Sequence, residues 1–147
     1  MTLHELAQHI DKLQADTQPR WGKMTAQHMV EHLTSTLLLA TGKNDVKVYT
    51  PQNQLAQMRA FLMSDKPIPR GVVSPAVGSE LPKLRNESFE AAVSEFKAEL
   101  SDFVAYYEAN PEAVHINPAF GELSFPEWEQ FMKKHFTHHF EQFGLLG

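Results

Sequence analysis

The sequence contains no cysteine. Disulfide frameworks, thiolate zinc sites, iron–sulfur clusters and cysteine nucleophiles are therefore excluded together. The chain also lacks an apolar run near the ~20 residues that a membrane-spanning helix needs. Its first residues do not combine a basic start with an apolar stretch, as a signal peptide would. These absences predict a cytoplasmic protein with no membrane partner.

Basic residues are scarce as well. The chain has 13 Lys and Arg residues against 18 Asp and Glu residues, which gives a formal net charge of −5. Nucleic acid is not an expected partner, because phosphate binding depends on a basic patch and the sequence has no basic run. Gly-rich phosphate loops, dinucleotide-binding fingerprints and the G-x-S-x-G nucleophile motif are also absent.

The hydrophobic pattern of the 147 residues is mainly helical. No repeat or linker divides the chain, so we expect a single domain, residues 1–147. The predicted helices cover residues 2–15, 25–42, 50–62, 89–110 and 124–144. Weak strand signals at residues 46–49 and 72–73 are too short to predict a sheet. The pattern predicts an all-α fold, an antiparallel four-helix bundle with a long crossover connection and a short extra helix.

Residues 65–85 interrupt this pattern with six Pro and Gly residues. A loop of this length inside one domain is often functional. One hypothesis is that its apolar residues pack over one end of the bundle and form part of a pocket wall; these residues are Ile68, Val72, Val73 and Val77. The alternative is a crossover connection with no further role.

The chain has eight histidines, and five of them fall in two predicted helices. His135 and His139 are spaced i, i+4, so their rings leave one helix face, and two imidazoles at this spacing can bind one small cation. They continue an inward stripe with Trp128, Met132 and Gln142. On the other helix, His32 lies between Met29 and Thr36 on the inward face. Three imidazoles therefore converge from two helices.

Two other interpretations compete with a metal site. A single inward histidine is often only a hydrogen-bonded core residue, but three buried imidazoles without a cation or hydrogen-bond partners would be costly. The segment from His28 to His32 also matches the H-x-x-E-H signature of some zinc peptidases. That interpretation leaves His135 and His139 unexplained, and Glu31 is expected ~100° round the helix from His32, nearer to solvent. The metal site is therefore favoured.

The histidine pattern resembles a known family. The segment HFTHHFEQ, residues 135–142, is similar to the HxxHHxxQ ending of the DinB/YfiT-like superfamily of small metal-binding four-helix bundles. Residues 21–25 and 29–32 resemble the segment where that superfamily places its first histidine ligand. Residues 117–124 resemble one uncharacterised bacterial branch, although Asn117 stands where that branch often has histidine.

The resemblance implies a site and a function. The metal ligands would be His32, His135 and His139, and the fold would be a bundle that often pairs as a homodimer. The ion would be divalent, with zinc or nickel preferred and iron or manganese as alternatives. Near the ligands but not among them we expect His28, His138 and Gln142. His138 is expected to be partly exposed, because it aligns with residues of the bundle rim.

The expected activity is that of a metal-dependent enzyme. Three imidazoles leave coordination positions open, so the ion could activate water or a low-molecular-weight thiol, in hydrolase or S-transferase chemistry. The partners would be a small-molecule substrate or a thiol cosubstrate. No catalytic side chain is assigned. The alternative is a non-catalytic, dimeric bundle that binds a metal or small ligand, and a fourth protein ligand such as His28 would favour it.

Overall fold

The computed structural model describes residues 1–70 and 80–146, and these residues are mostly helical. The α-helices are α1 (Leu3–Ala7), α2 (Ala26–Ala40), α3 (Leu55–Met63), α4 (Phe89–Ala109) and α5 (Phe125–Gln142). Two short 3-10 segments, Gln8–Lys12 and Gln52–Gln54, extend α1 and precede α3. No helix of the described residues is both long and apolar enough to cross a membrane.

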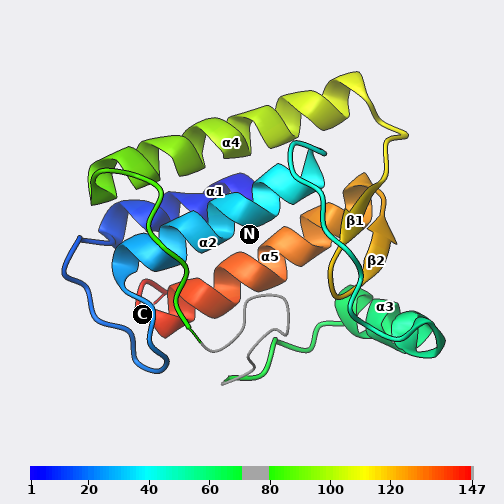
Figure 1. The fold of residues 1–147 in the computed structure, drawn as a ribbon, viewed down its shortest axis with the longest axis horizontal. Coiled ribbons are helices and arrows are strands. Elements are labelled where there is room, and N and C mark those ends of the chain that lie inside the picture. Colours follow the sequence, from blue (N-terminus) through cyan, green and yellow to red (C-terminus); the bar gives the residue numbers. More distant parts are fainter. Residues whose placement is uncertain (71–79, 147) are drawn as a thin grey trace.

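Helices α1, α2, α4 and α5 lie side by side, and α3 stands at one end beside a small hairpin (Figure 1). Helices α2 and α4 run in the same direction, because the Tyr107 hydroxyl near the end of α4 donates to the carbonyl of Ala40 at the end of α2. Helix α5 runs in the opposite direction, as the contact from Thr36 to Met132 and that from His32 to His135 show. Two parallel helices need a crossover, and residues 43–88 provide it.

Most of the α-helices begin at a residue whose side chain accepts a hydrogen bond from the first turn. Thr2, Thr25 and Ser88 accept from the backbone N–H groups three residues later, and Ser124 forms the predicted capping box with Glu127. The first predicted helix is wrong in one respect. It is α-helical only over Leu3–Ala7 and then tightens to 3-10 geometry, although its predicted apolar stripe is buried as far as Leu13.

The all-α prediction missed a two-stranded antiparallel hairpin, β1 (His115–Asn117) and β2 (Gly121–Leu123). Strands of three residues are too short for an alternating pattern, so tertiary contacts define them. The Asn117 carboxamide oxygen accepts from the N–H groups of Ala119 and Phe120 and forms the turn. Residues 46–49 are not a strand, and residues 72–73 lie outside the described residues.

Part of the prediction for residues 65–85 can be located. Ile68 is half-buried and lines a groove beside α5. The other apolar residues of that hypothesis, Val72, Val73 and Val77, lie outside the described residues.

The expectation that Glu31 is near solvent is wrong. Its side chain is only 8% exposed, because the chain that leads into α4 covers it. The carboxylate accepts hydrogen bonds from the backbone N–H groups of Arg85 and Asn86 and from the side chains of Gln27 and Asn86. Burial alone raises the pKa of this carboxyl group, but the hydrogen bonds outweigh burial and lower the pKa below its ordinary value. Glu31 thus anchors the end of the crossover to α2.

We predict that Glu31→Gln lowers the free energy of unfolding by about 2–3 kcal/mol near pH 7, because charge-assisted hydrogen bonds to a buried carboxylate are lost. The folded-state pKa is lowered, so Glu31 stabilises the fold above the ordinary carboxyl pKa. This contribution disappears as the pH falls through the folded-state pKa. The difference between wild type and variant should therefore shrink in acid, as measured by urea unfolding across pH.

The matched control is Glu112→Gln, which removes the same charge from an exposed position. It should change the unfolding free energy by less than about 0.5 kcal/mol. Equal stability of the two variants at pH 7 would contradict the anchoring role of Glu31.

Candidate metal centre

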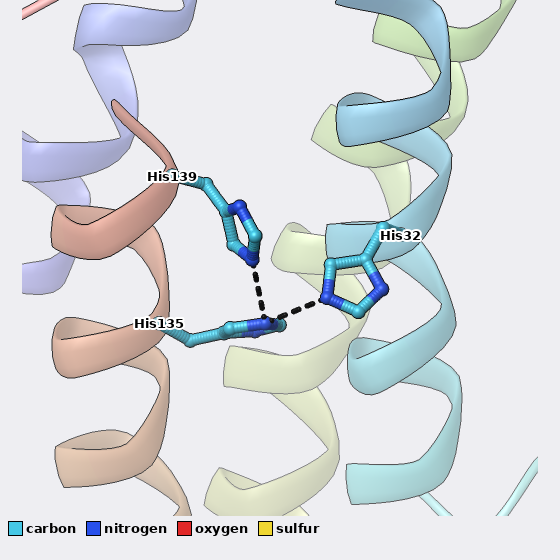
Figure 2. Close-up of side chains that lie close together, drawn as sticks. All are labelled: His32, His135 and His139. Carbon is cyan, nitrogen blue, oxygen red and sulfur yellow. Dashed lines mark hydrogen bonds between the residues drawn. The ribbon is translucent and has the colours of Figure 1, made fainter. Parts of the chain in front are cut away.

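Three histidine side chains meet between α2 and α5 (Figure 2). His32 comes from α2, and His135 and His139 come from successive turns of α5. The Nε2 atom of His135 lies 2.9 Å from that of His32 and 3.2 Å from that of His139. One ring nitrogen from each residue lies within 4.8 Å of the other two. In a tetrahedral zinc site with ~2.05 Å bonds the donor atoms are about 3.3 Å apart, so this spacing suits one ion.

Helix periodicity places these rings. The α5 stripe predicted from the sequence is buried throughout, and His135 and His139 are each 7% exposed. His32 is half-buried on the α2 face that packs against α5. The structure therefore brings the three predicted ligands together, and their role as metal ligands stays a prediction.

The side chain of Gln142 determines which nitrogen of His139 faces the centre. Its amide nitrogen donates to the backbone carbonyl of Trp21 at 2.9 Å, so its amide oxygen must face His139. That oxygen lies 2.7 Å from Nδ1 of His139 and accepts the Nδ1 proton. The Nε2 atom of the neutral ring then carries a lone pair that points at the other histidines. Metal-binding histidines commonly have such a partner on the other ring nitrogen.

The environment keeps the three rings neutral. Burial, followed by the charge of His138, lowers the pKa of His32 to about 4. Burial and then His32 lower the pKa of His139 to about 3. Burial, with the neighbouring histidines, also holds the pKa of His135 well below its usual value. Neutral imidazole is the form that binds a metal ion.

Hydrogen bonds among the rings do not satisfy all three nitrogens. A proton on Nε2 of His135 can point at only one of its two neighbours. If the proton of His135 is on Nδ1 instead, it has no acceptor among the described residues. The Nε2 atoms of His135 and His139, which are 3.2 Å apart, would then face each other with a lone pair on each. A divalent cation would accept all three lone pairs at once, and the residues therefore fit such an ion.

The other predicted neighbours lie at different distances from this centre. Both ring nitrogens of His28 are engaged elsewhere, Nδ1 with the Thr25 hydroxyl at 2.7 Å and Nε2 near the Pro82 carbonyl at 3.1 Å. His138 is half-buried, as expected; its Nδ1 lies 3.3 Å from the Ile68 carbonyl. Its ring is stacked edge-on against that of His139, with centroids 4.9 Å apart.

The contribution of Trp21 was not predicted from the sequence. The Trp21 carbonyl holds Gln142, and the Trp21 ring packs edge-on against His138 with centroids 5.7 Å apart. Trp21 lies in a segment that carries the family resemblance, but a backbone carbonyl leaves no signal of its own in a sequence. The Glu31 carboxylate, in contrast, accepts hydrogen bonds from four N–H donors and is therefore not free to serve as the base of a peptidase motif.

A comparison with protein-family models finds a match over much of the chain. The model of a family described as protein of unknown function (DUF1569) matches residues 56–144, a range that includes His135, His139 and Gln142. No curated protein and no solved structure matches the chain significantly.

We predict that Gln142→Leu weakens zinc binding by about 10- to 100-fold, because His139 then loses the acceptor that fixes its tautomer. Competition with a chromophoric chelator measures the affinity. The matched control is Gln130→Leu on the same helix, which removes a carboxamide bound to the carbonyls of Leu62 and Ser64. Equal zinc affinity in both variants would contradict the orienting role of Gln142.

Adjacent histidines of α5 should respond differently to the same substitution. We expect His138→Gln to keep the zinc content of the wild type, because its ring faces Ile68 and Trp21. His139→Gln should lose stoichiometric zinc. Metal analysis of the purified variants distinguishes them, and the reverse result would mean that the register of the site is wrong by one residue.

Proposed function

The chain belongs to the DUF1569 family, whose description assigns no function, and we propose that it is a metal-dependent enzyme with one divalent ion held by His32, His135 and His139. The observation that carries this proposal is the convergence of three Nε2 atoms from neutral imidazoles, of which those of His135 and His139 are buried and that of His32 is half-buried. We propose zinc or nickel as the ion, with iron or manganese as alternatives; imidazole suits zinc, nickel and iron, whereas manganese prefers oxygen ligands.

We further propose that the fold is a four-helix bundle of the DinB/YfiT-like type. The HxxHHxxQ segment, residues 135–142, supports this assignment. So do the parallel directions of α2 and α4, which require a long crossover between the second and third main helices (Figure 1).

An enzymatic role rests on the open coordination positions of a three-ligand site. Catalytic zinc sites typically have three protein ligands, whereas structural sites are closed by a fourth. His28 is the candidate for a fourth ligand, and its two ring nitrogens lie against Thr25 and Pro82 instead. When bound, the ion would supply a Lewis acid that lowers the pKa of a water molecule or a thiol.

The chain's own residues position the ligands and keep them unprotonated. Gln142 orients His139, and burial holds the three imidazoles in the form that donates a lone pair. The chain has no cysteine, so a thiol would have to come from a cosubstrate. Hydrolysis or S-transfer with a small-molecule substrate is the proposed reaction class.

The test is metal analysis of the purified protein and of matched histidine variants. Wild type should hold about one equivalent of divalent metal, and His135→Ala should hold none. His4→Ala is the control, because His4 is exposed and lies in α1, away from the site. His32→Ala serves as a second variant in case His135→Ala folds poorly, because His32 is only half-buried.

The coordination shell then separates an enzyme from a purely structural site. X-ray absorption of the zinc-loaded protein should show three nitrogen ligands and at least one exchangeable oxygen. Full metal content in both His135→Ala and His32→Ala would refute the site. Coordination by four protein nitrogens without an oxygen would refute the catalytic role.

A further inference from the structure

A groove of about 210 Å³ lies between the second half of α5 and the segment 64–68 that follows α3. We call it the basic groove, and its cationic and hydroxyl side chains are Lys66, Lys133, Lys134, Ser64 and Thr137. His138 forms part of the same wall. The groove lies on the α5 face next to the one that carries His135 and His139.

The groove has an excess of positive charge, although the whole chain carries a net charge of −5. Three lysines line it against two carboxylates, those of Asp65 and Glu141. Neither Lys66 nor Lys133 is in an ion pair within the described part of the chain. These ammonium groups therefore remain available to an anion.

Hydrogen bonding in the groove also favours an acceptor as ligand. Three backbone carbonyls of one wall are already occupied: that of Ser64 by Gln130, that of Lys66 by Lys134, and that of Ile68 by His138. Each ammonium group has three N–H donors, and Lys134 uses one of them on Lys66. Apart from the carboxylates of Asp65 and Glu141, a ligand in the groove thus meets mainly free donors.

His138 connects the groove to the histidine cluster. Its ring lines the groove and lies edge-on to the ring of His139, with centroids 4.9 Å apart. Its other neighbour is Trp21, and the guanidinium carbon of Arg70 lies 4.2 Å from the centre of that indole ring. A further cationic group therefore lies near the end of the groove that is closest to the cluster.

We propose that the basic groove is the substrate subsite of the metal centre and that it binds the carboxylate or phosphate end of a small anionic substrate. This inference rests on the proposed function for its catalytic meaning. The ammonium groups of Lys133 and Lys66 bind the oxyanion, and the rest of the substrate passes His138 towards the three histidines. Lys133 is the specificity-determining residue.

The test uses malonate and inorganic phosphate as probes, each titrated into zinc-loaded and zinc-free protein by calorimetry. Tryptophan fluorescence gives a second readout, since Trp21 lies beside Arg70 and His138 whereas Trp128, the other tryptophan, is fully buried. The variants are Lys133→Gln, the charge-preserving Lys133→Arg, and Lys47→Gln as control for an exposed lysine outside the groove. Preference for malonate or phosphate distinguishes a carboxylate from a phosphate ester.

We expect Lys133→Gln to bind the preferred anion at least about fivefold more weakly than wild type, because the variant lacks one charged hydrogen-bond donor. Lys133→Arg and Lys47→Gln should bind like wild type. Anion binding only to zinc-loaded protein, with equal affinity in Lys133→Gln, would place the anion on the metal and overturn the groove proposal. So would the absence of binding by either probe.

The two proposals fail in different ways. If the protein binds no metal but its anion affinity still depends on Lys133, the groove is an anion site and the proposed metal enzyme is wrong. If metal binds through the three histidines while Lys133→Gln has no effect, the metal centre stands and the basic groove is not its substrate subsite.

Discussion

The burial of three neutral imidazoles with converging lone pairs is the constraint on which the rest of this structure depends. Such a cluster is unfavourable by itself, because the rings lose water and cannot all donate to one another. It persists only where α2 and α5 hold His32 against His135 and His139. The packing of these two helices therefore supports a chemical site as well as a core.

Side chains next to the histidine cluster hold the crossover in place. On α2, His28 and Glu31 contact the carbonyl or N–H groups of residues 82–86. On α5, Lys134 and His138 contact the carbonyls of residues 66–68. The crossover is thus attached at residues 66–68 and at residues 82–86 to side chains that lie within about one helical turn of a predicted ligand. His28, which resembles a ligand in the sequence, thus contacts the Thr25 hydroxyl and the Pro82 carbonyl and not the other histidines.

The chemistry proposed for the site depends on which side chains near the histidines are free of contacts with the crossover. Glu31 is occupied by backbone and amide donors, so the carboxylate nearest in sequence to His32 is not available as a general base. His28 does not close the coordination shell. A three-ligand site without an assigned general base would suit a metal ion that acts as a Lewis acid. In the proposal, the cationic side chains of the basic groove position the substrate of this ion.

Local patterns in the sequence predicted the main helices, the caps at Thr2 and Ser124 and the inward stripe of α5, because periodicity and capping are properties of consecutive residues. They also predicted that His32 and the two α5 histidines face one interior. Which nitrogens meet depends on contacts between segments far apart along the chain, such as the one between Gln142 and Trp21, and these contacts exist only in the folded protein. The burial of Glu31 and the hairpin of β1 and β2 were likewise decided by segments distant in sequence, whose approach no local pattern encodes.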